Sequence, residues 1–326
     1  NGIGVRFTNA GTGTVNNGND FDGDPDPDNA RDIQATATAG TVLASPNNSF
    51  AGDTYGVENL SATNINATLN YWESPTGPGP VAFGSGTPIT TKVLYCPWLG
   101  SVGGSSVGPV KNTTTMETFC TIQEAVNDAQ TLSGHTLEVN SGNYNEQVLI
   151  NKGVIIKGVG PTKPVINFTG TPALASTRLT IFEVTVPGVT IDNLQFQVDQ
   201  SKVNSAILAS ATNVSNLTVK SSDINPYRSA ASYATGGYSQ RNAISINYGA
   251  FRVGGSVPAN LLIQGNTVTF MASGNPPIGA DTYAGFRGAV VTDDGGGTFT
   301  GNTFQTINQD IEARFGSAGD INVTNN

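Results

Sequence analysis

Five aspartates at alternate positions form the densest group of potential metal ligands in this chain. They lie in the segment Asn19–Asn29, around Gly23, and are Asp20, Asp22, Asp24, Asp26 and Asp28. Neighbouring carboxylates repel one another unless water or a cation screens them, and Ca²⁺ takes about six to eight oxygen ligands. Alternating acids around a turn glycine therefore predict a Ca²⁺ site. A solvated acidic turn is the alternative.

Carboxylates near arginines in the C-terminal part could support acid–base chemistry. Gln309-Asp310 precedes Glu312 and Arg314, which share a face if the strand alternates. Nucleophilic or acid–base catalysis would still need a second positioned carboxylate. The alternative is a solvated strand face with ordinary ion pairs.

A second acidic pair, Asp293-Asp294, could line a lyase-like groove with Arg287 and Arg314. Adjacent aspartates on a strand point to opposite faces, so a turn before Gly295 is the better interpretation. The single histidine, His135, precedes a predicted strand and is expected at an exposed edge.

Two further groups could serve structure or binding. Cys96 and Cys120 flank the Gly/Ser/Thr-rich segment 101–118, and a disulfide closing that loop would contribute about 3 kcal/mol. Two unpaired buried cysteines are the alternative. In the longest insertion lie Tyr227, Tyr233 and Tyr238. Their rings could stack on sugars, or they could fold the insertion back onto the protein.

A repeated sequence string predicts the elements that position these residues. Each copy has an apolar residue, four mostly small or polar residues, and another apolar residue. The copies are Ile191–Phe196, Val219–Ile224, Ile263–Val268, Phe299–Phe304 and the partial Val323–Asn326. Their starts are separated by 28, 44, 36 and 24 residues. Such spacing predicts stacked turns of a parallel solenoid, some with inserted loops.

Composition favours strands and excludes several functions. Charged residues make up 12% of the chain, hydrophobic residues 37%, and the formal net charge is −9. An acidic chain with no basic cluster is a poor partner for nucleic acid or anionic membranes. We find no apolar run long enough for a transmembrane helix.

The period changes at Thr121–Ala129, where apolar residues recur on one face of a helix. Thr121 and Glu124 form a capping-box pattern at its start. Upstream, the prolines and glycines near residues 74–80 end any regular ladder. Tyr95 and Trp98 follow in a predicted last strand, Lys92–Leu99, and we expect them to close a core.

These segments carry a family resemblance. The run from Thr121 to Lys152, with Gly142–Glu146 in its middle, resembles the opening of pectin-lyase-like and pectinesterase-like right-handed parallel β-helices. Asn70–Pro78 resembles the segment that ends β-helix regions in large secreted bacterial surface proteins, with Glu73 where that pattern has Gly. The aspartate string is similar to thrombospondin-type-3 and dockerin-like calcium loops.

The predicted fold is all-β: a right-handed parallel β-helix (solenoid) with a short amphipathic capping helix near 121–130. We expect terminal turns of one β-helix in 1–100 and a linker in 101–118. A second, N-terminally capped β-helix is expected in 119–326, continuing past the chain end. One repeating unit written out of phase is the alternative.

The predicted function is that of a non-catalytic extracellular or cell-surface protein, an adhesive or structural stalk. Its expected partners are copies of itself or polysaccharide, and its possible cofactor is Ca²⁺. The rival is a polysaccharide lyase or pectinesterase-like enzyme acting on acidic polysaccharide. Against the rival, the chain lacks the pectinesterase motifs and the Gly-His-Gly of polygalacturonases.

Overall fold

The computed structural model shows two compact units. The first holds residues 1–109 and 118–120, and the second holds residues 110–117 and 121–326. The described residues are 2–15, 18–21, 30–51, 54–79, 84–171, 179–209, 214–227, 242–246, 259–269, 288–293, 296–305, 311–314 and 321–324. Within these ranges, every element except one short helix is a β-strand.

Most strands of the second unit belong to three sheets. The first sheet contains β12 (Val110–Asn112), β14 (Thr136–Asn140), β17 (Ile155–Val159), β20 (Thr190–Asp192), β23 (Thr218–Lys220), β26 (Leu261–Gln264), β29 (Gly297–Thr300) and β32 (Ile321–Thr324). The second contains β15 (Asn143–Asn145), β18 (Val165–Asn167), β21 (Gln195–Asp199), β24 (Asp223–Tyr227), β27 (Thr267–Thr269) and β30 (Thr303–Gln305). The third contains β16 (Val148–Ile150), β19 (Thr180–Val184), β22 (Ser205–Ala209), β25 (Asn242–Ile246), β28 (Gly288–Asp293) and β31 (Ile311–Arg314).

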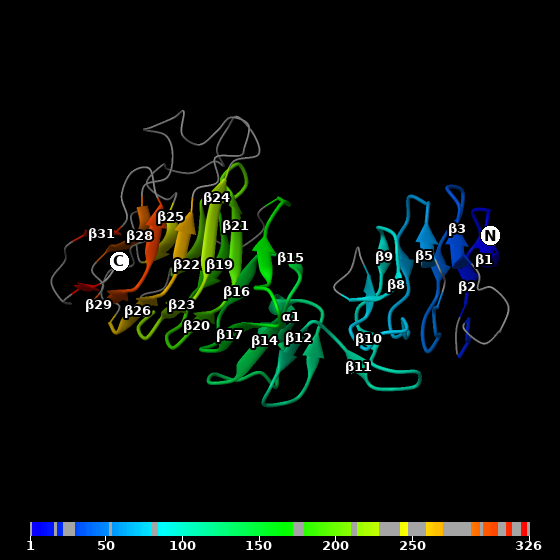
Figure 1. Cartoon of the computed structure of the whole chain (residues 1–326), viewed down its shortest axis with the longest axis horizontal. Coiled ribbons are helices and arrows are strands. Elements are labelled where there is room, and N and C mark those ends of the chain that lie inside the picture. The colour runs from blue at the N-terminus through cyan, green and yellow to red at the C-terminus, as the bar shows by residue number, and fades with distance from the viewer. Residues whose placement is uncertain are drawn as a thin grey trace. The chain divides into compact units, whose positions relative to one another are not determined.

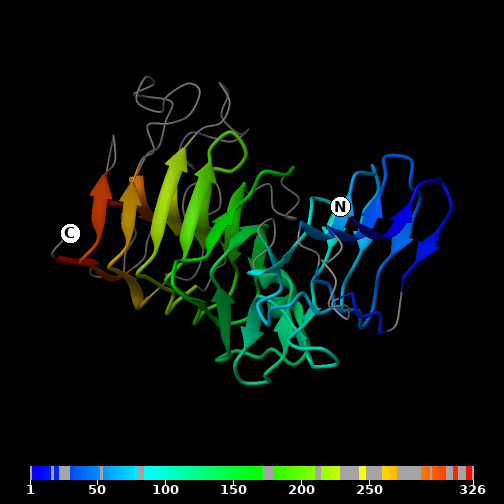
Figure 2. The same ribbon diagram turned by 45° about the vertical axis from the view of Figure 1, so that its right-hand side comes forward.

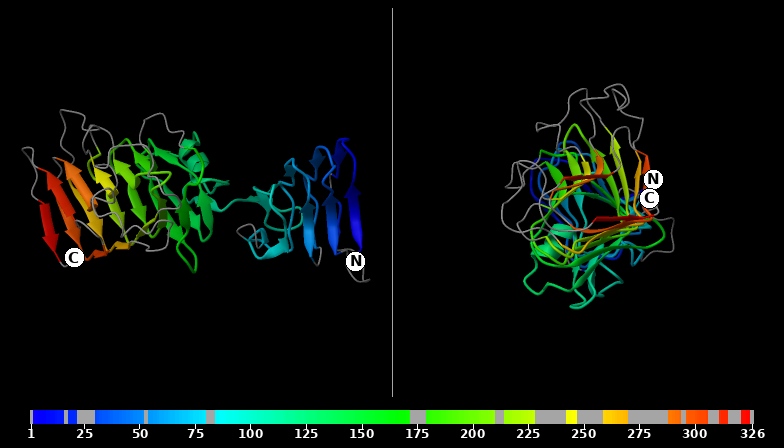
Figure 3. Two further views of the ribbon diagram at one scale, coloured as in Figure 1. Left: turned by 90° about the horizontal axis from the view of Figure 1, so that it is seen from above. Right: turned by 90° about the vertical axis from the view of Figure 1, so that its left-hand side faces the viewer.

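Consecutive strands enter these three sheets in turn. From β14 to β32, each circuit of the chain adds one strand to every sheet, and neighbouring strands pair in parallel. β12 is different, because it pairs antiparallel with β14. Figures 1 and 2 show the resulting rows of strands, and Figure 3 shows them from above. This stacking of parallel strands is compatible with the predicted solenoid.

The repeated strings occupy matching positions in successive turns. Ile191 pairs with Val219, which pairs with Ile263, and Phe299 and Val323 continue the column. The second apolar residues form another column of Phe196, Ile224, Val268 and Phe304. Burial of Ile191, Val219 and Ile263 is complete. The prediction that these strings stack on one another is therefore confirmed.

A column of buried polar side chains lines the corner between the first and second sheets. The backbone N–H groups of Ser222 and Asn266 donate to the Oδ1 atoms of Asn266 and Asn302 respectively, each at 3.0 Å. Asn266 Nδ2 also donates to Asn302 Oδ1 at 3.0 Å and to the Val219 carbonyl at 2.8 Å. These side chains are at most 2% exposed. Each amide therefore joins neighbouring turns and satisfies backbone groups that are removed from water.

The residue before each position of this column, and before Leu194 at the equivalent corner of the preceding turn, has a left-handed backbone. The φ angles are 57° at Asn193, 52° at Ser221, 61° at Gly265 and 63° at Gly301. Only glycine adopts this conformation without steric cost, and asparagine tolerates it better than most residues. The sharp corner thus recurs in four successive turns.

The first unit is built from shorter parallel strands. One sheet holds β1 (Ile3–Phe7), β3 (Arg31–Ala35) and β5 (Tyr55–Asn59), and another holds β2 (Gly13–Thr14), β4 (Val42–Leu43), β6 (Ile65–Asn66) and β9 (Val93–Leu94). β7 (Pro78–Gly79) pairs with β8 (Gly86–Pro88), and β10 (Trp98–Leu99) pairs antiparallel with β11 (Ser106–Val107). The predicted single strand Lys92–Leu99 was wrong. It is split into β9 and β10, because Pro97 has no N–H for a ladder.

The first unit repeats the asparagine corner. Asn48 Oδ1 accepts from Asn19 Nδ2 at 2.8 Å, and Asn48 Nδ2 donates to Asn70 Oδ1 at 3.0 Å. Gly18, Asn47 and Leu69, which precede these asparagines, again have positive φ.

Two residues after each corner asparagine, an aromatic side chain enters the core. The ring centroids of Phe21 and Phe50 lie 5.4 Å apart, and those of Phe50 and Trp72 lie 4.7 Å apart. The corner therefore aligns an aromatic stack through three turns of the first unit.

Segment 101–118, where composition predicts a linker, contains short strands: β11, β12 and part of β13 (Thr118–Phe119). No helix among the described residues is long and apolar enough to cross a membrane.

The helix α1 (Ile122–Asn127) begins at the predicted capping box. Thr121 Oγ1 accepts from Glu124 N at 3.1 Å, and Glu124 Oε2 accepts from Thr121 N at 3.2 Å. The helix is six residues long, so it occupies only part of the predicted segment 121–130. The Asp128 carboxylate accepts from the N–H groups of Gln130 and Thr131, which begins a turn instead.

Glu146 attaches this helix to the first circuit of strands. Its two carboxylate oxygens accept from the N–H groups of Ile122 and Gln123, each at 3.0 Å. Burial raises the pKa of Glu146, and the charge of Glu124 adds to this, while the two N–H donors lower it. The net result is a pKa above the ordinary value.

Asn266→Ala should destabilise the protein by about 2 kcal/mol or more, because it leaves the Ser222 N–H and the Val219 carbonyl buried without this partner. Urea-induced unfolding measures the effect. Gln264→Ala is the matched control, since Gln264 is exposed in the same turn, and it should change stability by less than about 0.5 kcal/mol. Equal unfolding midpoints for the two variants would contradict the role given to the column.

Glu146 should make stability depend on pH in a defined direction. Because its folded pKa lies above the ordinary value of 4.5, its contribution is fully present below that value and is lost as pH rises through the folded pKa. The wild type should therefore lose unfolding free energy with rising pH relative to Glu146→Gln, which does not titrate. Urea unfolding of both proteins across this range provides the measurement, and parallel curves would refute the prediction.

Candidate functional site

The described residues include only the start of the predicted calcium loop. Asp20 is exposed, and its backbone forms a parallel bridge with Ser49. Outside the described residues lie Asp22, Asp24, Asp26 and Asp28. Within the described part of the chain, no group of three or more His, Cys, Asp or Glu residues could hold a metal ion. Calcium binding by this loop stays a prediction.

Cys96 and Cys120 form a disulfide within the first unit, with their Cα atoms 5.8 Å apart. Nearby, Trp98 is 3% exposed, and its Nε1 donates to the Pro75 carbonyl at 3.0 Å. Tyr95 packs against the same core, with its ring centroid 6.2 Å from that of Trp98. The disulfide therefore lies beside a well-packed part of the first unit.

The structure describes little of the acid–base candidates. Outside the described residues lie Arg287, Asp294, Gln309 and Asp310. The strand register places Asp293 of β28 opposite Arg314 of β31, and Glu312 opposite Val291. The single histidine, His135, belongs to the start of the second unit. Its Nδ1 lies 3.2 Å from the side-chain Nδ2 of Asn112.

Of the three predicted ligand-binding tyrosines, Tyr227 is described, at the end of β24, and it is partly exposed. It pairs in register with Asp199 at the end of β21. Burial raises the pKa of Tyr227, and the negative charge of Asp199 raises it further. Tyr227 thus remains a neutral phenol, a hydrogen-bond donor beside a carboxylate. Tyr233 and Tyr238 lie outside the described residues.

A column of carboxamides runs along the outer face of the second sheet, beside the apolar column. We call it the carboxamide column, and it consists of Asn145, Asn167, Gln197 and Asn225. Each member directly follows a buried apolar residue, so it points to the opposite face. Sequence reasoning missed this column. Its signal was available, because a carboxamide follows the apolar residue in four successive turns.

The members differ in their hydrogen bonding. Asn145 is occupied, since its Nδ2 donates to Thr169 Oγ1 and its Oδ1 accepts from Thr169 N, both at 2.9 Å. The Asn167 Oδ1 atom is buried and has no hydrogen-bond partner among the described residues. Gln197 and Asn225 are partly exposed and make no side-chain hydrogen bond to another described residue. Consequently, two adjacent turns present unused donors and acceptors.

Further unused polar atoms lie where β21 ends. Gln200 is fully buried, yet within the described part of the chain neither its Oε1 nor its Nε2 has a hydrogen-bond partner. Its backbone N–H donates to the Tyr227 carbonyl at 2.8 Å. Buried polar groups usually have hydrogen-bond partners, so the side-chain amide of Gln200, next to Tyr227, is a candidate functional group.

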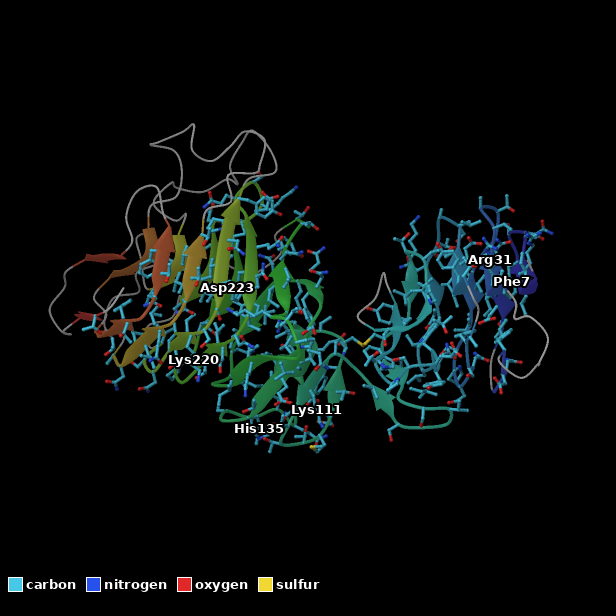
Figure 4. The ribbon with its side chains drawn as sticks, viewed as in Figure 1. Phe7, Arg31, Lys111, His135, Lys220 and Asp223 are labelled. Carbon is cyan, nitrogen blue, oxygen red and sulfur yellow. A yellow bond between two sulfur atoms is a disulfide. The ribbon has the colours of Figure 1, made fainter. Side chains whose placement is uncertain are left out.

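Charges on these faces are largely paired. On the second sheet, Lys163 Nζ lies 2.7 Å from Asp223 Oδ1, with both side chains about one-third exposed, at 28% and 35%. On the first sheet, Lys220 Nζ lies 3.4 Å from Asp192 Oδ2. Lys220 and Asp223 lie on either side of the corner (Figure 4).

The Asp192–Lys220 pair belongs to a longer column on the first sheet. In register, it runs Lys111, Glu138, Lys157, Asp192 and Lys220. Opposite charges thus alternate over five strands, and such cross-strand pairs stabilise a sheet, whereas like charges opposite each other destabilise it.

Comparisons with known proteins give one partial relative. No family model matches the chain, and no solved structure matches it. A stretch of 58 residues is 41% identical to a protein of Methanothermus fervidus called cell surface glycoprotein. The match covers 18% of this chain and 10% of that relative. The similarity is therefore confined to less than a fifth of this chain and to a tenth of the relative.

The aspartate loop yields a metal-binding prediction. We expect Ca²⁺ to bind the chelator-treated protein and to stabilise it by about 2.7 kcal/mol at a concentration of about 100 times Kd. Calorimetric titration and thermal unfolding with and without Ca²⁺ measure both effects. Asp22→Asn/Asp24→Asn should abolish them, and the control Asp192→Asn, in the second unit, should retain them. Ca²⁺ binding unchanged in the double variant would refute the assignment.

Proposed function

We propose that this chain is part of a cell-surface protein whose stacked β-strands form a rigid, non-catalytic stalk with an adhesive or structural role. In this proposal both units are right-handed parallel β-helices, because parallel crossover connections are almost always right-handed. The cyclic entry of strands into the three sheets supports the second unit's assignment. The repeated asparagine corner supports the same architecture in the first unit.

The observation that carries the proposal is the chemistry of the side chains that lie in register across successive turns. In the second unit they are carboxamides and alternating charges. In the first unit, Arg6 donates to Gln34, which donates to Glu58, across β1, β3 and β5. Arg31 pairs with the same Glu58 at 2.6 Å. Such ladders pair charged and polar side chains between neighbouring turns, which favours a rigid stack of turns.

Two observations support a location outside the cell. Disulfides persist mainly in oxidising compartments, and Cys96 and Cys120 form one. The partial relative is called a cell surface glycoprotein. We extend that location to this chain as part of the proposal, together with self-association or polysaccharide as the partner of its exposed faces.

The rival is a polysaccharide lyase or esterase, and one observation favours it. The register places Asp293 opposite Arg314, the pairing of carboxylate and arginine from which acid–base chemistry could be built. The ordered pairing of charges elsewhere favours the stalk.

Two measurements test the proposal. Intact cells that produce the full protein should lose it on brief external protease treatment and should bind antibodies against it. The purified protein, incubated with polygalacturonate and Ca²⁺, should release neither unsaturated product nor acid. Protection from external protease would overturn the surface location. Turnover that Asp293→Asn abolishes would establish the enzyme instead.

A further inference from the structure

We propose that the outer face of the second sheet binds an uncharged polysaccharide, through Gln197, Asn225 and Tyr227. The inference rests on the proposed role as a surface protein and names the ligand class of one of its faces. The three residues come from β21 and β24, which are neighbours in the sheet (Figure 1).

The hydrogen-bonding capacity of this face matches hydroxyl groups. Gln197 and Asn225 lie in register, and neither side chain bonds to another described residue. A carboxamide offers two donors and one acceptor, and a sugar hydroxyl both donates and accepts. Half-buried amides of this kind are already partly desolvated, so bonding to a ligand costs less than it would for fully exposed groups.

The spacing of the face matches a polymer. Neighbouring strands lie about 4.8 Å apart, which is close to the length of one pyranose along a β-1,4-linked chain. A polysaccharide running across the strands would therefore meet one carboxamide per sugar. Asn167, whose buried Oδ1 has no partner in the ranges that the structure describes, extends the same column by one turn.

Tyr227 supplies the remaining element of a sugar site. It lies two residues beyond Asn225 on the same strand, so both point to the same face. Its ring can cover a sugar face, and its hydroxyl remains a donor because its pKa is raised by burial and by Asp199.

Charge selects an uncharged polymer over an acidic one. On this face Lys163 is already paired with Asp223, so its charge is not free for an acidic ligand. The chain as a whole carries a formal charge of −9. A polyanion such as polygalacturonate would be repelled, whereas a neutral chain would not.

Affinity electrophoresis of the full chain tests the inference, with soluble mixed-linkage β-glucan, galactomannan and polygalacturonate in separate gels. We expect retardation by at least one neutral polymer, independent of salt concentration, and none by polygalacturonate. Gln197→Ala/Asn225→Ala should weaken neutral binding by about tenfold or more.

Thr190→Ala/Thr218→Ala is the matched control, because it alters the same two turns on the outer face of the first sheet. It should bind as the wild type does. Circular dichroism verifies that both double variants are folded. No binding to either neutral polymer, or equal loss in both variants, would overturn the inference. The protease and antibody tests of surface location would be unaffected by that result.

Discussion

The buried amide at the corner between sheets is the interaction on which the rest of the structure depends. A chain that turns sharply inside a stack of strands removes backbone N–H and C=O groups from water, and these groups must be paired. The Asn266 side chain accepts from the Ser222 N–H and donates to the Val219 carbonyl, both in the preceding turn, and it also donates to the Asn302 side chain of the next turn. In the first unit, the Asn48 side chain likewise accepts from the Asn19 N–H and donates to the Val15 carbonyl and to the Asn70 side chain. Once these corners are aligned, the strands on either side have their register fixed, and the apolar columns follow.

Much of the second unit could be predicted from sequence because its regular positions are apolar. The first residues of the repeated strings, such as Val219 and Ile263, stack where the pattern predicts. The capping box at Thr121 was predictable for a similar reason, since both of its hydrogen bonds are local. The end of the helix was not, because Ala129 continues the apolar periodicity while Asp128 forms a competing turn. Periodicity reports which face is buried, but side-chain bonds to the backbone decide where an element stops.

The candidate site was harder to predict, because its signal depends on knowing the register. Gln197 and Asn225 lie 28 residues apart and are unremarkable in a chain rich in amides. Only the pairing of β21 with β24 brings them together. The corner asparagines of the first unit were missed for the same reason, although an aromatic residue follows each by two positions. The tyrosines were identified from the sequence by residue type alone. The structure adds the neighbours of Tyr227, which are the Asp199 carboxylate and the amides of Gln197 and Asn225.

The corner also explains how the repeat tolerates uneven spacing. Ser222, Asn266 and Asn302 are separated by 44 and 36 residues, yet each bonds directly to the next. Whatever length the chain inserts between corners, the column restores the register, so loop length is separated from core packing. Variation can then accumulate in insertions and on outer faces without disturbing the stack, because the corner side chains, not the outward ones, hold the register. In a fold of this kind each turn contributes one outward side chain to a potential binding face, as in the carboxamide column.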